Sequence, residues 1–168
     1  MADPRWLDDE EQQAWRAWIQ ANRLVMDQLE RDLQAGSSLP VTYFEVLVNL
    51  SEAPGRSMRM SELARRSLSS PSRLSHAVAR MEELGWVRRE SCPTDRRGAV
   101  AVLTDEGFRV IEAAAPGHVE SIRTHFLDHL SREQVGQIRE IGEAVSRHLR
   151  DERDAACDRV EAEGACDS

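Results

Sequence analysis

Long stretches of the chain carry apolar residues at helical spacing on one face. The first stripe covers residues 15–33, and four carboxylates at residues 8–11 complement the dipole of a helix that begins there. Similar stripes follow Thr42, Thr104 and Ser131, and each of these hydroxyl residues is suited to cap a helix N-terminus. The pattern therefore predicts a mainly helical chain with long helices towards both ends.

The stretch of residues 61–107 has a different pattern, with short elements close together. It predicts a short helix over 61–66, a polar turn, and a second helix with Ser70 as N-cap and Pro71 at its first helical position. Gly85 supplies a C-terminal stop. The apolar residues expected to face a core from the second helix are Leu74, Val78, Met81 and Leu84.

Two extended segments, residues 86–92 and 99–103, predict a β-hairpin. The loop between them contains Pro93 and Gly98, which suit a tight backbone. A further extended segment over residues 56–60 is expected to add a third strand. The fold class that follows is mainly α with a small β-hairpin, an α+β arrangement.

The formal net charge of −8 hides an uneven distribution along the chain. Residues 56–109 hold 11 arginines against seven acidic residues, whereas the segments before and after this block are each acidic by six charges. No carboxylate occurs from Leu63 to Met81. Because phosphate affinity depends on local charge rather than on the total, the central block is suited to nucleic acid.

The second short helix and the hairpin tip carry the residues expected to contact DNA. A cationic, hydroxyl-rich helix face suits the major groove, and arginines at a hairpin tip suit the minor groove, whose negative potential attracts them. Asp95 is expected to hold the guanidinium of Arg97. Either Arg88 or Arg89 is expected to brace the hairpin against Glu82 or Glu83. The candidate DNA contacts are Ser69, Ser70, Ser72, Arg73, Ser75, His76, Arg80, Arg88, Asp95, Arg96 and Arg97.

This region resembles the winged helix-turn-helix signature of the MarR family of transcriptional regulators. The segments that carry the resemblance are Gly85-Trp86-Val87-Arg88-Arg89, Asp95-Arg96-Arg97, Val102-Leu103-Thr104 and Glu106-Gly107. The resemblance covers about residues 8–150. It implies a homodimer on double-stranded DNA with a pseudo-palindromic operator, its recognition helices in consecutive major grooves and its wings in the minor groove. It also implies release by a small ligand or an oxidant.

Four segments are expected along the chain. They are an N-terminal dimerisation helix (1–39), the winged helix-turn-helix domain (40–107), C-terminal dimerisation helices (108–150) and an acidic, disordered tail (151–168). The winged unit is too small to cover the apolar stripes of the long helices. We therefore expect a second copy of the chain to bury them about a two-fold axis.

An effector pocket is expected where the long helices meet the winged unit. Aromatic walls with a few polar groups suit a small aromatic or lipophilic acid. The candidate lining residues are Trp15, Trp18, Asn22, Tyr43, Phe44 and Glu45. Ordinary core packing explains the same residues equally well, so both interpretations stay open.

The remaining candidate chemistry gives weaker signals. His125 and His129 stand four residues apart, a spacing that metal sites use, but no third ligand is fixed near them, so we expect no metal and no cofactor. Cys92, Cys157 and Cys166 are scattered and fit no disulfide framework. No catalytic motif occurs, and the chain is not expected to be an enzyme.

The function that these patterns favour is a dimeric, sequence-specific DNA-binding transcriptional regulator, a repressor released by a small ligand. No apolar run reaches the length of a membrane span and no signal peptide precedes the first helix, so a cytoplasmic location with no membrane partner is expected. Two alternatives stay open: a winged-helix protein-interaction module without DNA binding, and a thiol-based redox-sensing regulator.

Overall fold

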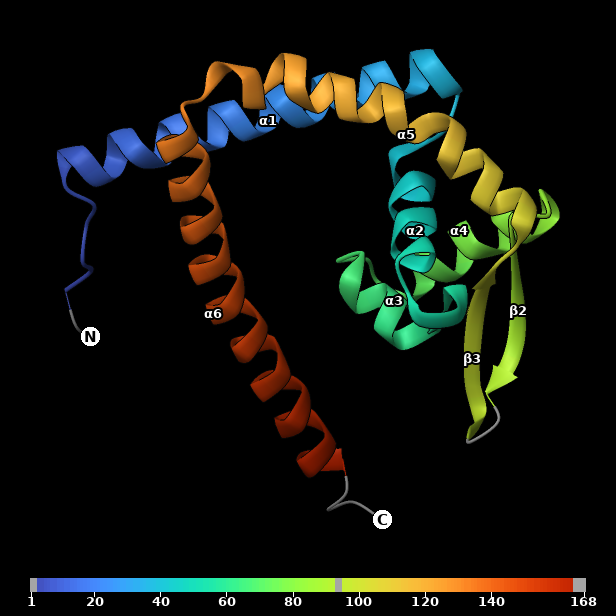
Figure 1. Cartoon of the computed structure of the whole chain (residues 1–168). Helices are drawn as coiled ribbons and strands as arrows, with labels where there is room; N and C mark the ends of the chain where they lie inside the picture. Colours follow the sequence, from blue (N-terminus) through green and yellow to red (C-terminus); the bar gives the residue numbers. More distant parts are fainter. Residues whose placement is uncertain (1–2, 93–94, 165–168) are drawn as a thin grey trace. The chain divides into compact units, whose positions relative to one another are not determined.

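The computed structural model describes the backbone of residues 3–92 and 95–164 and the side chains of residues 3–91 and 98–150. The chain divides into two compact units, Met1–His125 and Phe126–Ser168. Its elements, labelled in Figure 1, are α1 (Asp9–Ser37), α2 (Val41–Ser51), η1 (Pro54–Arg56), β1 (Ser57–Arg59), α3 (Met60–Arg66), α4 (Pro71–Glu83), β2 (Val87–Cys92), β3 (Asp95–Leu103), α5 (Asp105–His125), η2 (Leu127–His129) and α6 (Arg132–Gly164). None of the helices in this described part combines the length and the apolar character that a membrane span requires.

Two long helices, α1 and α5, pack against each other in the first unit (Figure 1). The start of α1 is fixed by a capping box, in which the Glu11 backbone N–H donates to Asp8 Oδ1 at 2.8 Å and the Asp8 N–H donates to Glu11 Oε2 at 3.0 Å. Helix α5 continues through Pro116, although the proline removes one backbone donor.

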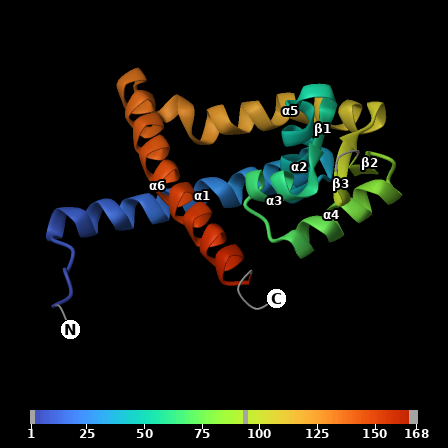
Figure 2. The same ribbon diagram turned by 90° about the horizontal axis from the view of Figure 1, so that it is seen from below.

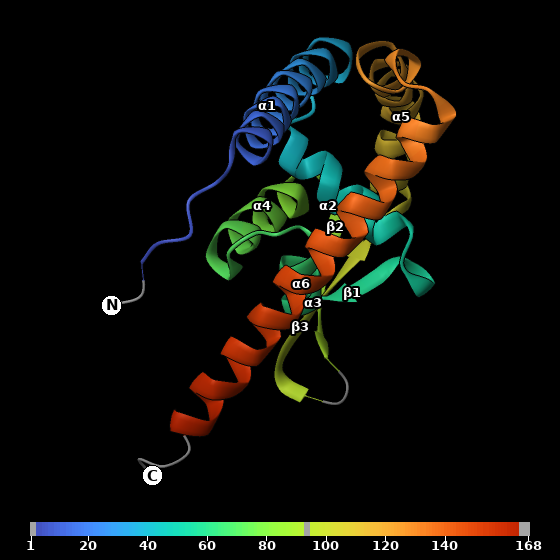
Figure 3. The same ribbon diagram turned by 90° about the vertical axis from the view of Figure 1, so that its left-hand side faces the viewer.

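The three strands form one antiparallel sheet in the order β1-β3-β2, which confirms the predicted third strand. Ser57 pairs with Val102 in one ladder, and Val87 pairs with Leu103 in the other. Figure 3 shows β2 and β3 extending together beyond β1 as a two-stranded arm. We call this arm the wing.

The core of the first unit lies between the short helices and the sheet. Seven large side chains in it are almost completely removed from water: Val46, Leu47, Leu50, Leu63, Leu74, Val78 and Met81. Three of them come from α4, so the apolar face predicted for that helix is its buried face. Burial of this face fixes which side of α4 remains exposed.

Two helix starts differ from the sequence prediction. Helix α3 begins at Met60, with Arg59 as its N-cap, rather than at residue 61. Helix α2 has Pro40 as its N-cap rather than Thr42, and neither helix has a side-chain capping bond. The reason is the preceding backbone. Arg59 is extended because it ends β1, and Pro40 is extended at φ −60° and ψ 139°, so each helix begins immediately afterwards.

Two further predictions around the wing need correction. Leu84 is 46% exposed rather than buried, because it is the C-cap of α4 and lies past the last packed turn. The predicted loop up to Gly98 is shorter than expected, since β3 already starts at Asp95 and pairs with Cys92 beyond an irregularity after Ser91. Residues 93–94 lie outside the described part of the chain.

The second unit contains η2 and α6. Ser131 and Gln134 form the predicted capping box of α6, with the Ser131 N–H donating at 2.8 Å and the Gln134 N–H at 3.2 Å. The backbone of α6 is helical to Gly164, which corrects the predicted end near residue 150. Of the acidic tail expected after that residue, residues 165–168 and all the side chains lie outside the described part.

Candidate nucleic-acid interface

Helix α4 is held at both ends by local hydrogen bonds. Ser70 is its N-cap, as predicted, and its Oγ accepts the backbone N–H of Arg73 at 3.3 Å. Beyond the other end Gly85 has φ +74°, and the N–H groups of Gly85 and Trp86 donate to the carbonyls of Glu82 and Met81, both at 2.9 Å. This is a Schellman motif, which ends the helix at a defined residue.

One side of α4 is polar and open to solvent. We call the set Ser69, Ser70, Ser72, Arg73, Ser75, His76 and Arg80 the reading face. Within it Ser70, Ser72, Arg73, His76 and Arg80 are exposed, whereas Ser69 and Ser75 are partly buried. The structure therefore brings the predicted helix residues together on one accessible surface.

The arginines near this face differ in their partners. Arg80 pairs with Glu83 on the same helix. Arg65 and Arg66 of α3 share the carboxylate of Glu62, at 2.8 Å and 2.7 Å. Arg73 has no ion-pair partner among the described residues. Of the two arginines in the reading face, Arg73 is therefore the one that no described acidic side chain neutralises.

The base of the wing is braced to α4. The Arg89 N–H donates to Glu82 Oε1 at 2.7 Å, and its guanidinium contacts the second oxygen, so Arg89 is the arginine that fills the predicted bracing role. Arg88 instead pairs with Glu90 at 2.8 Å along β2. The backbone of Asp95, Arg96 and Arg97 belongs to β3, but their side chains lie outside the described part, so their DNA contacts stay predictions.

Thr104 joins the end of α4, the wing and the start of α5. Its Oγ1 lies 2.7 Å from the carbonyl of Gly85 and 3.0 Å from that of Trp86, and it accepts the Gly107 N–H at 3.0 Å. The predicted capping role of Thr104 is therefore confirmed. Thr104 therefore links the first turn of α5 to the backbone that leads into β2.

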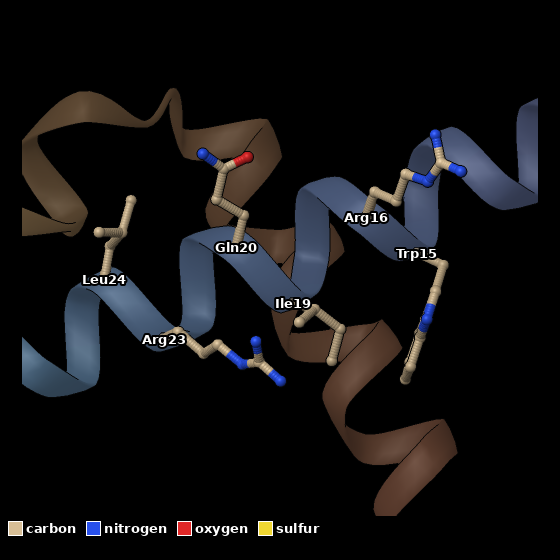
Figure 4. Close-up of a pocket in the computed structure, with 6 residues that line it drawn as sticks. All are labelled: Trp15, Arg16, Ile19, Gln20, Arg23 and Leu24. Atoms are coloured by element: carbon tan, nitrogen blue, oxygen red, sulfur yellow. The ribbon is translucent and has the colours of Figure 1, made fainter.

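None of the hollows found among the described residues brings the six effector candidates together. Trp15 lines a hollow of about 360 Å³ whose other residues all come from α1: Arg16, Ile19, Gln20, Arg23 and Leu24 (Figure 4). Trp18 and Asn22 are exposed on the same helix. Tyr43 packs edge-on against Trp86 with ring centroids 6.5 Å apart, and desolvation raises the pKa of Glu45.

The sixth candidate, Phe44, lies beside a histidine. Its ring centroid is 4.4 Å from that of His118, whose Nδ1 is buried with no hydrogen-bond partner among the described residues. Burial lowers the pKa of His118. His118 also lines a second hollow of about 80 Å³ between α1 and α5, together with Asp32, Leu33, Gly36, Ser37, Ala113, Ala114 and Gly117. Binding of an effector by any of the six stays a prediction.

Sequence reasoning missed a polar contact between α1 and α5. Ser121 Oγ donates to Asp32 Oδ2 at 2.5 Å, and His125 Nε2 lies 3.0 Å from the same oxygen. The hydrogen bonds from Ser121 and then Gln28, with the His125 contact, hold the pKa of Asp32 below its usual value. The only signal in the sequence was the four-residue spacing of Ser121 and His125 on one helix face.

Metal binding and thiol chemistry gain no further support. Within the described residues there is no group of three or more His, Cys, Asp or Glu side chains placed to hold a metal ion. The side chains of Cys92, Cys157 and Cys166 lie outside the described part. Redox sensing by one of these cysteines therefore stays a prediction.

A capped helix with a cationic exposed face, preceded by a short helix and a turn and followed by a braced wing, defines a winged helix-turn-helix domain, a class of DNA-binding fold. A family model described as MarR family matches residues 37–98. The HTH-type transcriptional regulator PecS of Dickeya dadantii (strain 3937) is 30% identical over 128 residues, which are 75% of this chain and 76% of PecS. The chain belongs to the MarR family of transcriptional regulators.

Two solved structures from Streptomyces coelicolor are similar along most of the chain. Sco3205, a MarR family regulator crystallised in complex with DNA, is 49% identical with a TM-score of 0.83 and covers 87% of this chain and 92% of its own. AbsC, also a MarR family regulator, is 48% identical with a TM-score of 0.82, and the match covers 88% of this chain and 99% of AbsC. These relatives are transcriptional regulators.

Proposed function

We propose that this chain is a dimeric, sequence-specific DNA-binding repressor that a small ligand releases. The observation that carries the proposal is the reading face. It is exposed and hydroxyl-rich, and its Arg73 meets no acid among the described residues of a chain with net charge −8. The structure of Sco3205 in complex with DNA supports DNA binding by this chain, and a helix with such a face suits the major groove.

The case for a dimer rests on uncovered apolar surface in both units. On α1, Trp15 and Trp18 are 56% and 50% exposed, and Leu24 and Met26 are also exposed. On α6 of the second unit, the large apolar side chains that are exposed among residues 132–150 are Ile141, Val145 and Leu149. Patches of this kind are unusual on a monomer and are buried most simply by a second copy.

The case for ligand release rests on the α1–α5 interface. Asp32 and His118 both line the 80 Å³ hollow there, and Nδ1 of His118 has no hydrogen-bond partner among the described residues. The hollow is smaller than the roughly 300–1,000 Å³ of ligand sites, so a ligand that entered would have to part the two helices. Because the first turn of α5 is tied to the wing through Thr104, such a shift would move the wing.

The test is binding to the DNA upstream of the chain's own gene, compared with a random duplex at several salt concentrations. Arg73→Ala should weaken binding and lower the salt slope by about one for each phosphate that the protein no longer neutralises. Arg97→Ala should do the same through the wing. Arg31→Ala, which removes an exposed arginine paired with Asp27 on α1, is the matched control. A wild-type protein with no preference for its upstream DNA over the random duplex would refute the proposal.

A further inference from the structure

The turn between α3 and α4 places a polar side chain inside and an apolar one outside. Ser67 is the C-cap of α3, and its Oγ is buried without a hydrogen-bond partner among the described residues. The next residue, Leu68, is 74% exposed. Burying an unpaired hydroxyl and exposing a leucine both disfavour the folded chain. Stability of the free protein therefore does not explain this pair of residues.

The backbone of Leu68 is unfavourable as well. Its φ of +47° lies in the left-handed region, where the Cβ atom of any residue but glycine is crowded. The Leu68 N–H donates to the Arg65 carbonyl at 3.3 Å and the Ser69 N–H donates to the Ala64 carbonyl at 3.0 Å. These two bonds form a Schellman motif, in which glycine usually occupies the position that Leu68 has here.

Leu68 lies next to the surface that would meet DNA. It directly precedes Ser69 and Ser70 of the reading face, and Figure 2 shows the connection from α3 looping out beside the start of α4. Arg65 and Arg66 precede the turn, and Arg73 follows it in the first turn of α4. A duplex docked on these cations also presents apolar surface, namely thymine methyl groups and the faces of deoxyribose.

We propose that Leu68 is a DNA-contacting residue whose side chain packs on this apolar surface of the duplex, beside the helix that enters the major groove. The proposal rests on the DNA-binding function proposed above. In the free protein the leucine is exposed to water on a strained backbone. In the complex the duplex removes the leucine from water. Leu68 therefore lowers the stability of the free protein but raises its affinity for DNA.

The experiment separates stability from affinity. Wild type, Leu68→Gly, Leu68→Ala and Leu68→Met are compared for thermal unfolding and for binding, by fluorescence anisotropy, to a duplex that the wild type has selected from a random library. Leu68→Gly should unfold at the same or a higher temperature, because the strain is relieved, yet bind about tenfold more weakly because no apolar side chain packs on the duplex. Leu68→Met should bind nearly as the wild type does.

Leu84→Ala is the control, since Leu84 is an exposed leucine at the other end of α4. It should leave the affinity unchanged.

Deoxyuridine in place of each thymidine then identifies the contacted atom. Loss of affinity at one position in the wild type but not in Leu68→Ala assigns a thymine methyl; weaker binding of Leu68→Ala to every duplex, with no sensitive thymidine, assigns deoxyribose.

Two results would count against these proposals in different ways. If Leu68→Gly and Leu68→Ala bind the selected duplex as tightly as the wild type, Leu68 makes no DNA contact and the inference is wrong, while the proposed function stands. If the wild type selects no sequence from the library, the proposed function itself fails.

Discussion

At the scale of single residues, one carboxylate forms ion pairs with two of the arginines beside the reading face. Glu62 receives both Nε and Nη2 of Arg65 at 2.9 Å and Nε of Arg66 at 2.7 Å. The hydrogen bonds from Arg66 and then from Arg65 hold the pKa of Glu62 below its usual value. Ion pairs this exposed add little stability, so their main consequence is for charge.

We expect Glu62→Gln to tighten binding to DNA. Removing the carboxylate leaves Arg65 and Arg66 to neutralise phosphates, so affinity should rise about three- to tenfold and the salt dependence should steepen. Anisotropy titrations at several salt concentrations measure both effects. Asp27→Asn, which removes the acid paired with Arg31 on α1, is the control and should change neither. Weaker binding by Glu62→Gln would mean that DNA needs the two arginines in the pose that Glu62 holds.

His118 makes stability depend on pH. Burial lowers its pKa in the folded chain, so below the unfolded value of about 6.5 the unfolded chain binds more protons than the folded chain does. The contribution of His118 is therefore fully present above about pH 6.5 and is lost as the pH falls towards the lowered pKa. His118→Phe keeps a ring against Phe44 and carries no proton. Urea unfolding at pH 7.5 and 5.5 should show a smaller loss of stability in this variant than in the wild type.

The exposed His76 provides the control for that comparison. His76→Gln should lose as much stability on acidification as the wild type does. An equal loss in wild type and His118→Phe would show that another group is responsible for the pH dependence.

At the scale of elements, α5 packs directly on the backbone where the wing begins. Gly107 lies in the first turn of α5, and a Cβ atom there would come 2.1 Å from the carbonyl oxygen of Trp86 and 2.8 Å from Leu103 Cδ1. Only a residue without a side chain allows this approach. The contact keeps the helix, the end of α4 and the wing in one arrangement.

We therefore expect Gly107→Ala to lower the free energy of unfolding by about 3 kcal/mol or more, since backbone atoms must move to admit the methyl group. Denaturant unfolding measures this loss. Gly117→Ala is the matched control on the same helix. No atom lies within 4 Å of its Cβ position, so it should raise stability by about 0.5–1 kcal/mol. A Gly107→Ala protein as stable as the wild type would show that the packing at Trp86 is looser than described.

At the scale of the whole molecule, both units expose apolar surface on their long helices. The hollow of Figure 4 is lined by side chains of α1 alone, including Trp15, Ile19 and Leu24. The exposed apolar residues of α6 are a second uncovered surface. Burial in a dimer would also place two reading faces on one DNA duplex.

Trp18→Glu tests the dimer, because it introduces a charge among the exposed apolar residues of α1. We expect the molar mass in sedimentation equilibrium to fall from that of a dimer to that of a monomer, and DNA affinity to fall at least about 100-fold because one half-site is lost. Leu84→Glu places the same charge on an exposed leucine away from α1 and should stay dimeric. A wild type that is monomeric at micromolar concentration would contradict the proposed dimer.

Helix caps, the buried face of α4 and the local charge could be predicted from the sequence alone, because they depend on residues close together in the chain. Ser70, Pro71, Gly85 and Thr104 act on backbone groups a few residues away, so their signals could be read directly and the structure confirms them. The apolar period of α4 likewise determined which face is buried, and hence which predicted DNA contacts are exposed. The pattern failed at Leu84 because spacing alone cannot show where packing stops.

Contacts between residues far apart in the chain could not be predicted and were found in the folded structure. The sequence could not show that Asp32 meets Ser121 and His125, or that Gly107 meets the Trp86 carbonyl. Nor could it show that the hollow beside Trp15 is lined by none of the other effector candidates. It also could not show that Arg73 meets no acid among the described residues while its neighbours bind acids. The physical reason is that these distances depend on how α1, α5 and the wing pack against one another, and packing is a property of the whole chain rather than of any short stretch.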